Sequence, residues 1–192
     1  MPFNIPIFLT WLRIVLIPLM IAVYYVPDSW VHGLGRNLTA TLIFVVAAAT
    51  DWLDGYLARR LDQTSAFGAF LDPVADKLMV ASALIMLVQL DRLDAIIAAI
   101  IIGREITISA LREWMAQIGA HKSVAVSMIG KIKTTAQMAA IPLLLYQAPI
   151  DGFNILLAGT VLIYVAAVLT LWSMGYYLRM AWPHLAAQDK KP

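Results

Sequence analysis

The stretch DWLDGYLARRLDQTSAFGAFLDPVAD, residues 51–76, carries five aspartates and two adjacent arginines, although the whole chain is 61% hydrophobic. The chain has 192 residues, a mean hydropathy of +0.79 and only 14% charged residues, whereas ordinary soluble domains carry about 25%. Carboxylates in or beside a bilayer are costly and mark functional sites. The sequence therefore predicts a membrane protein whose chemistry lies in this acidic stretch.

Apolar segments recur along the whole chain, and each is near the ~20 residues that cross hydrocarbon. We predict an all-α, polytopic membrane protein with six transmembrane helices, forming one integral membrane catalytic domain over residues 1–192. Because cysteine is absent, a disulfide framework and a thiolate metal site are excluded. The predicted spans are 5–26, 37–58, 74–90, 95–116, 128–147 and 153–178.

The distribution of lysine and arginine predicts the orientation, because cytoplasmic loops carry the excess of positive residues. Six spans place both termini and the second and fourth loops on one side. Only Arg36 and Arg92 lie on the opposite side, so we expect both termini and the acidic stretch to be cytoplasmic. The basic residues on the cytoplasmic side are Arg59, Arg60, Lys77, Arg112, Lys122, Lys131, Lys133, Arg179, Lys190 and Lys191.

Helical spacing groups the acids, since residues three and four apart share a face. Asp51 and Asp54 lie on one stripe near the end of the second span, and Asp72 and Asp76 lie on another where the third begins. A short link predicts that these helices are antiparallel neighbours with converging carboxylates. Such a set needs cations that prefer oxygen ligands, Mg²⁺ or Mn²⁺ rather than zinc. Two ions sharing the carboxylates would suit displacement at phosphorus.

Each acid taken alone has a simpler explanation. Asp72 precedes Pro73 and could be the N-cap of a helix that begins there. Asp51 and Asp54 could form a solvated helix end that pairs with the adjacent arginines. The joint pattern is harder to explain in this way, because it requires several residue types in register across residues 51–76.

A longer pattern, D-x2-D-G-x2-A-R-x8-G-x3-D-x3-D, runs from Asp51 to Asp76. It resembles the signature of the CDP-alcohol phosphotransferase family, and all of its fixed positions are filled. The stretches NIPIFLTWLRIVLIP, GREITISALREWMA and SVAVSMIGKIKTTAQM resemble the bacterial members that use glycerol 3-phosphate. The likeness covers most of the chain except the last span and the tail.

The resemblance implies a six-helix enzyme of the bacterial inner membrane, usually a homodimer, that transfers the phosphatidyl group of CDP-diacylglycerol to glycerol 3-phosphate. Membrane lipid is an implied partner, and no nucleic acid is expected. Asp76 is implied as the catalytic base that deprotonates the acceptor hydroxyl. Two divalent cations, Mg²⁺ or Mn²⁺, are implied on Asp51, Asp54, Asp72 and Asp76. The implied CDP-diacylglycerol-binding residues are Gly55, Ala58, Arg59 and Gly68.

A phosphorylated acceptor requires a basic pocket, and the candidates are Lys131, Lys133, Arg112 and Arg104. The alternatives are that the lysines are interfacial anchors and that Arg104 has a purely structural partner. Because adjacent helical positions point about 100° apart, we expect Glu105 to face Arg112 rather than Arg104. In the first span, Arg13 either borders the nucleotide cleft with Thr10 or snorkels to the headgroups.

Three further alternatives stay open on the sequence. Another acceptor, such as inositol phosphate or serine, would keep the same reaction class. An intramembrane prenyltransferase also uses aspartates and Mg²⁺ on a diphosphate, but it would not require a basic acceptor pocket. A small secondary transporter would more often show internal repeats and acids at mid-membrane.

Overall fold

The computed structural model describes residues 5–60, 66–119, 128–150 and 152–188, and these ranges contain helices and no β-sheet. The prediction of an all-α protein is confirmed. A short 3-10 helix, η1 (Val23–Tyr25), extends the first α-helix. The α-helices are α1 (Ile5–Ala22), α2 (Gly33–Arg60), α3 (Ala66–Gln89), α4 (Ala95–Gln117), α5 (Met128–Tyr146) and α6 (Ile155–Gln188).

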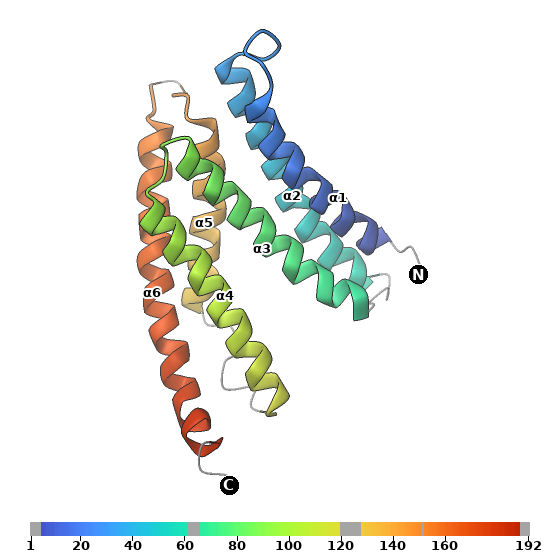
Figure 1. Ribbon diagram of the computed structural model, residues 1–192, viewed down its shortest axis with the longest axis vertical. Helices are drawn as coiled ribbons and strands as arrows, with labels where there is room; N and C mark the ends of the chain where they lie inside the picture. The colour runs from blue at the N-terminus through green and yellow to red at the C-terminus, as the bar shows by residue number, and fades with distance from the viewer. Residues whose placement is uncertain (1–4, 61–65, 120–127, 151, 189–192) are drawn as a thin grey trace.

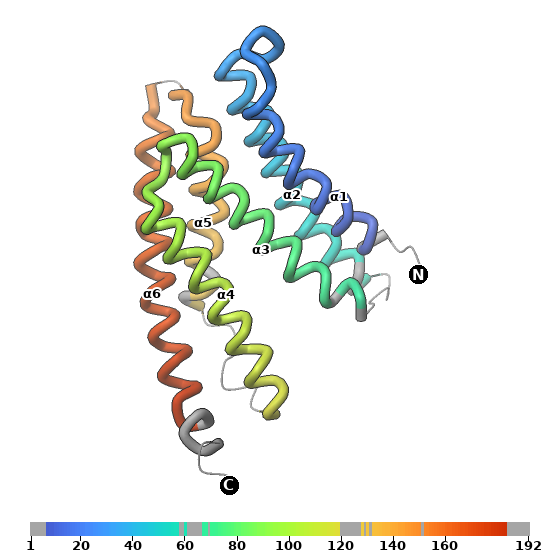
Figure 2. The backbone as a smooth tube through the Cα atoms, in the orientation of Figure 1, coloured from blue at the N-terminus to red at the C-terminus, as the bar shows by residue number. Residues whose placement is uncertain are grey.

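The helices form two groups, which are connected by α3 and by the packing of α2 on α5 (Figure 1). The first group is the α1–α2 pair, and the second consists of α4, α5 and α6. In the tube view, α3 runs diagonally from the end of the first group to the second (Figure 2). Although α2 and α3 touch, α3 packs more extensively on α1. The first helix therefore lies against both helices that carry the acidic stretch.

The third helix begins earlier than the sequence predicts, at Ala66 instead of near residue 74. Pro73 is consequently inside α3, and the suggestion that Asp72 caps a helix starting at Pro73 is wrong. Proline removes one backbone donor from a helix, but in membrane proteins neighbouring groups can compensate for that loss. The Lys77 ammonium donates to the Pro73 carbonyl oxygen at 3.2 Å, within the helical turn that follows the proline.

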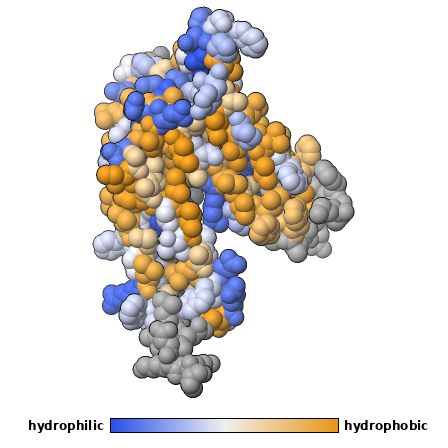
Figure 3. Space-filling view, viewed as in Figure 1, coloured by the Kyte–Doolittle hydropathy of each residue, from blue (hydrophilic) through white to orange (hydrophobic). Residues whose placement is uncertain are grey.

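Three helices of the described chain are long and apolar enough to cross a membrane, over Ile7–Tyr25, Gly33–Leu57 and Ile155–Pro183. Figure 3 shows hydrophobic atoms over the middle of the molecule and hydrophilic atoms gathered toward its ends. Large exposed apolar surfaces of this kind mark membrane contact in a protein. The remaining helices, α3, α4 and α5, are interrupted by charged or polar residues, among them Asp72, Glu105 and Lys133.

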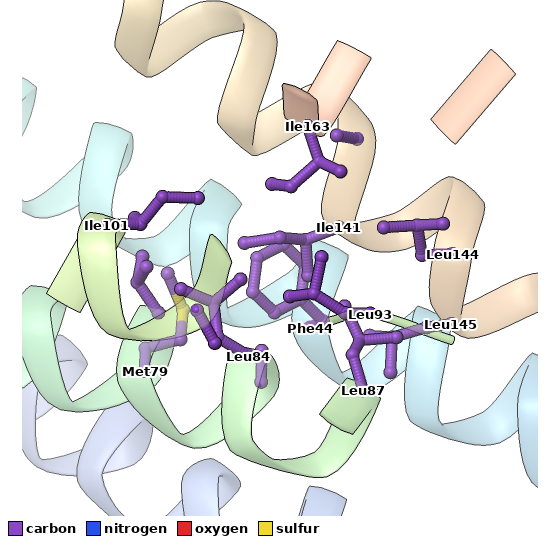
Figure 4. Close-up of a cluster of buried hydrophobic side chains, with 14 of the residues drawn as sticks. Phe44, Met79, Leu84, Leu87, Leu93, Ile101, Ile141, Leu144, Leu145 and Ile163 are labelled. Carbon is purple, nitrogen blue, oxygen red and sulfur yellow. The ribbon is translucent and has the colours of Figure 1, made fainter. Parts of the chain in front are cut away.

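The apolar core lies where α2, α3, α4, α5 and α6 meet, and Ile17 and Met20 of α1 complete it. Phe44 of α2 is at its centre, and side chains of the other helices surround its ring (Figure 4). Between membrane helices such contacts stabilise mainly through close van der Waals packing. The other labelled members are Met79, Leu84, Leu87, Leu93, Ile101, Ile141, Leu144, Leu145 and Ile163.

Arg92 links α5 to α2 at the end of the bundle farthest from the acidic stretch. Its guanidinium donates to the carbonyl oxygens of Leu144 and Leu145 at 3.2 and 2.6 Å, and to Asn37 Oδ1 at 2.8 Å. The last carbonyls of a helix have no partner within that helix. Arg92 therefore caps α5 and also ties it to α2.

Gly159 allows α5 and α6 to approach closely. A Cβ at this position would lie 3.0 Å from Leu144 Cγ and 3.1 Å from Leu143 Cβ. We expect Gly159→Leu to lower the free energy of unfolding by about 1–3 kcal/mol, the usual cost of overpacking. The matched control is Gly175→Leu on the same helix, where a Cβ would meet nothing within 4 Å. Thermal unfolding in detergent measures both, and equal melting temperatures would contradict the prediction.

Candidate active site

The acidic end of α2 is held by a cation from α1. Arg13 is fully buried at 0% exposure, and its Nη1 lies 2.7 Å from Asp51 Oδ1. Its Nη2 donates to Asp54 Oδ2 in a short charge-assisted hydrogen bond. Asp54 is itself only 3% exposed, whereas the Asp51 side chain is partly open. A buried carboxylate requires such a partner, so Arg13 supplies the counter-charge for Asp54.

Thr10 makes the equivalent connection to α3. Its hydroxyl donates to Asp72 Oδ1 at 2.5 Å, one helical turn before Arg13. The suggestion that Arg13 snorkels to the headgroups is wrong, because the side chain points into the protein and is buried. The suggestion that the adjacent arginines neutralise the α2 acids is not supported by Arg60, which donates to Tyr56 Oη at 2.6 Å.

The four aspartates share one electrostatic neighbourhood. The Asp54 carboxylate is close enough to Asp51 and Asp72 to be repelled by both, and Asp76 is repelled by Asp51. In the described residues, however, no three acidic or histidine side chains already surround one point as metal ligands would. The Arg13 guanidinium lies between two of the carboxylates, those of Asp51 and Asp54.

The small residues of the signature flank these acids. Gly55 directly follows Asp54 in α2 and is partly exposed, and Gly68 is buried one turn before Asp72 in α3. The side chains of Ala58 and Arg59 lie outside the described part of the structure.

A second charged cluster is built from α4, α5 and α6. The Lys133 ammonium donates to Glu105 Oε1 in a short ion pair, and Arg104 Nη1 donates to the same oxygen at 3.3 Å. Arg104 Nη2 donates to Ser173 Oγ at 3.0 Å. Lys133 and Arg104 are both buried. The expectation that Glu105 turns away from Arg104 is wrong, because both side chains are long enough to bend toward each other.

Arg112 joins this cluster through an aromatic ring. Its Nη2 lies 3.2 Å from Tyr177 Oη, and its guanidinium carbon is 5.1 Å from the ring centroid. The Arg104 guanidinium carbon is 5.9 Å from the same ring. Tyr177 is fully buried, so one π face helps to hold two like charges near each other. The side chain of Lys131 lies outside the described residues.

A cavity of about 70 Å³ joins the two clusters. Asp76 and Lys77 line it from α3, Glu105 from α4, and Thr134 and Gln137 from α5. In the space-filling view the surface is hollowed between the two helix groups, and hydrophilic atoms lie in the hollow (Figure 3). Asp76 is thus the member of the acidic stretch that faces the basic cluster.

An apolar groove of about 150 Å³ lies beside this cavity between α3 and α4. It shares Lys77, Val80 and Glu105 with the cavity, and Leu78 and Ile106 form part of its open side. A ligand with an apolar part and a charged part would therefore find complementary surfaces next to each other.

Sequence reasoning missed the roles of Ser173 and Tyr177. Both are buried on α6 and contact the basic cluster. A signal was present, because Thr170, Ser173 and Tyr177 follow helical spacing within an apolar segment. Polar residues on one face of a membrane helix usually face the protein interior.

Comparison of the sequence with known proteins shows the family to which the chain belongs. Residues 3–172 match the CDP-alcohol phosphatidyltransferase family, and the chain belongs to it. The family prediction is confirmed, and the prenyltransferase and transporter alternatives are set aside.

Individual relatives match over nearly their full length and share one name, CDP-diacylglycerol–glycerol-3-phosphate 3-phosphatidyltransferase. The protein of Yersinia enterocolitica is 54% identical over 187 residues, covering 96% of this chain and 98% of its own. That of Escherichia coli K12 is 52% identical over 183 residues, covering 94% and 96%. That of Pseudomonas fluorescens is 51% identical over 191 residues, covering 98% and 95%.

Proposed function

We propose that this protein is an enzyme that transfers the phosphatidyl group from CDP-diacylglycerol to glycerol 3-phosphate, giving phosphatidylglycerol phosphate and CMP. The names of the relatives, at about half identity over nearly the whole chain, support this reaction. The structural observation that carries the proposal is the cavity that Asp76 shares with Glu105, whose carboxylate holds Lys133 and Arg104. A base and an anion-binding cluster are thereby close enough to act on one small phosphorylated alcohol.

We further infer that Asp51, Asp54, Asp72 and Asp76 hold divalent cations, two of them and either Mg²⁺ or Mn²⁺. The residues fit such ions because the donors are all carboxylates, the ligands that hard cations prefer. Four carboxylates also carry more negative charge than the single positive charge of Arg13 can balance. When bound, the cations would neutralise a diphosphate and the charge that develops on it.

The reaction on this proposal is one displacement. Asp76 takes the proton from the primary hydroxyl of glycerol 3-phosphate, and the resulting oxygen attacks the β-phosphorus of CDP-diacylglycerol. A new P–O bond forms to the acceptor, the bond from that phosphorus to the bridging oxygen breaks, and CMP leaves with the electron pair. Positioning and charge neutralisation carry most of the catalysis in such transfers.

We also propose binding roles for the remaining site residues. Lys133, Arg104 and Arg112 hold the acceptor phosphate, with Lys131 as a further candidate. On the donor side, Arg59 binds the diphosphate, and the small residues Gly55, Ala58 and Gly68 leave room for the nucleotide. The apolar groove between α3 and α4 suits the lipid part of the donor because it opens beside Asp76's cavity.

We also propose the finer features of membrane placement. All six α-helices cross the bacterial inner membrane, both termini are cytoplasmic, and the enzyme is a homodimer. The excess of basic residues on the side of the acidic stretch supports this orientation. Charged residues in α3, α4 and α5 are tolerated within the membrane when they face a polar cavity or each other.

CMP release tests the proposed function. We expect the purified protein in detergent with Mg²⁺ to release CMP from CDP-diacylglycerol when glycerol 3-phosphate is added, and little when glycerol, serine or inositol phosphate replaces it. Glycerol is the matched control, because it has the same hydroxyl but lacks the phosphate. CMP release that depended on serine or inositol phosphate would reassign the acceptor, and no release with any acceptor would refute the proposal.

A further inference from the structure

Arg13 is an arginine completely enclosed by the protein and held by carboxylates of α2. One of its terminal nitrogens meets Asp51 and the other meets Asp54. Among the described residues, Arg13 Nε and Nη1 are buried without a hydrogen-bond partner, so the Nη1 contact with Asp51 is an ion pair and only Nη2 donates a hydrogen bond, to Asp54. The guanidinium is therefore fixed by these two carboxylates, and it occupies the space between them.

Arg13 occupies one oxygen of each carboxylate, Asp51 Oδ1 and Asp54 Oδ2, and so leaves fewer donor atoms for an external cation. A charge-assisted bond to a guanidinium withdraws a carboxylate lone pair from other partners. The positive charge also raises the energy of a second cation placed nearby, and burial strengthens that repulsion. Arg13 and a divalent cation thus compete for at least part of one donor set.

We propose that Arg13 is a positioning residue, an internal counter-cation that competes with divalent cations for Asp51 and Asp54 and thereby sets the ion concentration at which the site fills. This inference rests on the proposed function, because it requires that the aspartates bind such ions. Thr10 extends the effect to α3, since it holds Asp72 from the same face of α1. The first helix then stabilises the acidic stretch in the ion-free protein, and its contacts with the carboxylates are replaced when ions bind.

A purely structural Arg13 and a competing Arg13 predict opposite changes. If the arginine only ordered the aspartates, its removal would weaken ion binding. If it competes, removal weakens the ion-free protein but strengthens ion binding. Measuring both quantities on the same variant therefore separates the two roles.

The experiment uses the full chain in detergent, with Mn²⁺ as the probe. Electron paramagnetic resonance of free Mn²⁺ gives the affinity, and thermal unfolding with and without Mn²⁺ gives stability. For Arg13→Met we expect binding about tenfold or more tighter than in the wild type, from the loss of a competing charged partner. We also expect a lower melting temperature without Mn²⁺ and a larger rise when Mn²⁺ is added.

Two further variants keep the test decisive. Arg13→Lys retains the charge but replaces two terminal nitrogens with a single ammonium on a shorter side chain, so it should fold and show an intermediate Mn²⁺ affinity. Arg36→Met is the matched control, because Arg36 pairs with Asp28 at the opposite end of α2, 2.9 Å away. Its Mn²⁺ affinity should equal that of the wild type.

The outcomes separate this inference from the proposed function. Unchanged or weaker Mn²⁺ binding in both Arg13 variants, with wild-type binding that is lost in Asp72→Asn, would overturn the competition and leave the metal site intact. Wild-type protein that binds no Mn²⁺ would overturn the metal site and the competition together. Tighter binding in Arg13→Met with an unchanged Arg36→Met would support both.

Discussion

Asp76→Asn lowers kcat by about 10²–10⁴-fold, the usual contribution of a general base, if Asp76 removes the acceptor proton. Asparagine has nearly the same shape but cannot accept that proton. Asp76 is partly buried and lines the cavity next to Glu105 and Thr134, so the fold should change little. Because Asp76 is also a proposed metal ligand, the Mg²⁺ concentration must be high enough to fill the site in the variant. CMP release at saturating Mg²⁺ and saturating concentrations of both substrates measures kcat directly.

The control for this substitution is Asp28→Asn. Asp28 is exposed at the end of the molecule away from the site, where it pairs with Arg36. This variant should retain normal kcat, and both proteins should have the same circular dichroism spectrum. Near-normal turnover in Asp76→Asn would remove Asp76 from the role of base.

Lys133→Met is expected to raise the KM for glycerol 3-phosphate by about 10- to 100-fold, because a hydrogen bond to a charged group contributes about 1.5–3 kcal/mol. The effect on the KM for CDP-diacylglycerol should be small. Lys133 is buried and close to the cavity of Asp76 through Glu105. Initial rates of CMP release at varied concentrations of each substrate give the two KM values.

A double variant distinguishes binding from charge balance. The single substitution leaves Glu105 without one of its two cations, and this could weaken acceptor binding by repulsion alone. In Lys133→Met/Glu105→Gln that negative charge is also gone. If Lys133 binds the phosphate, KM should stay high in the double variant, and a return to the wild-type KM would show that the lysine only balances Glu105.

The helical class and the acidic stretch were predictable because they depend on local spacing. Asp51 and Asp54 are on one helix face in any α-helix that contains them, and the same holds for Asp72 and Asp76. The extent of α3 was not predictable from Pro73, since tertiary contacts determine whether a proline-containing helix continues. Pro73 indicates a helix boundary when the sequence is considered alone, but in the folded protein α3 continues through it.

The partners of the site residues were harder to predict than the residues themselves. Arg13 is 41 positions from Asp54, and nothing in local spacing connects them. Arg104 and Ser173 are 69 positions apart, and their contact depends on how α4 packs on α6. Sequence patterns therefore indicated which side chains carry the chemistry, but the choice of counter-ions required the three-dimensional arrangement.

The position of the small cavity between an apolar groove and a basic cluster has a consequence for substrate traffic. On the proposed function, one substrate dissolves in the bilayer and the other in the cytosol. The lipid substrate can enter laterally from the bilayer through the groove between α3 and α4. The water-soluble substrate enters from the side of Lys133 and Arg104. Neither substrate therefore has to cross the solvent of the other, and both entry routes can be open at the same time.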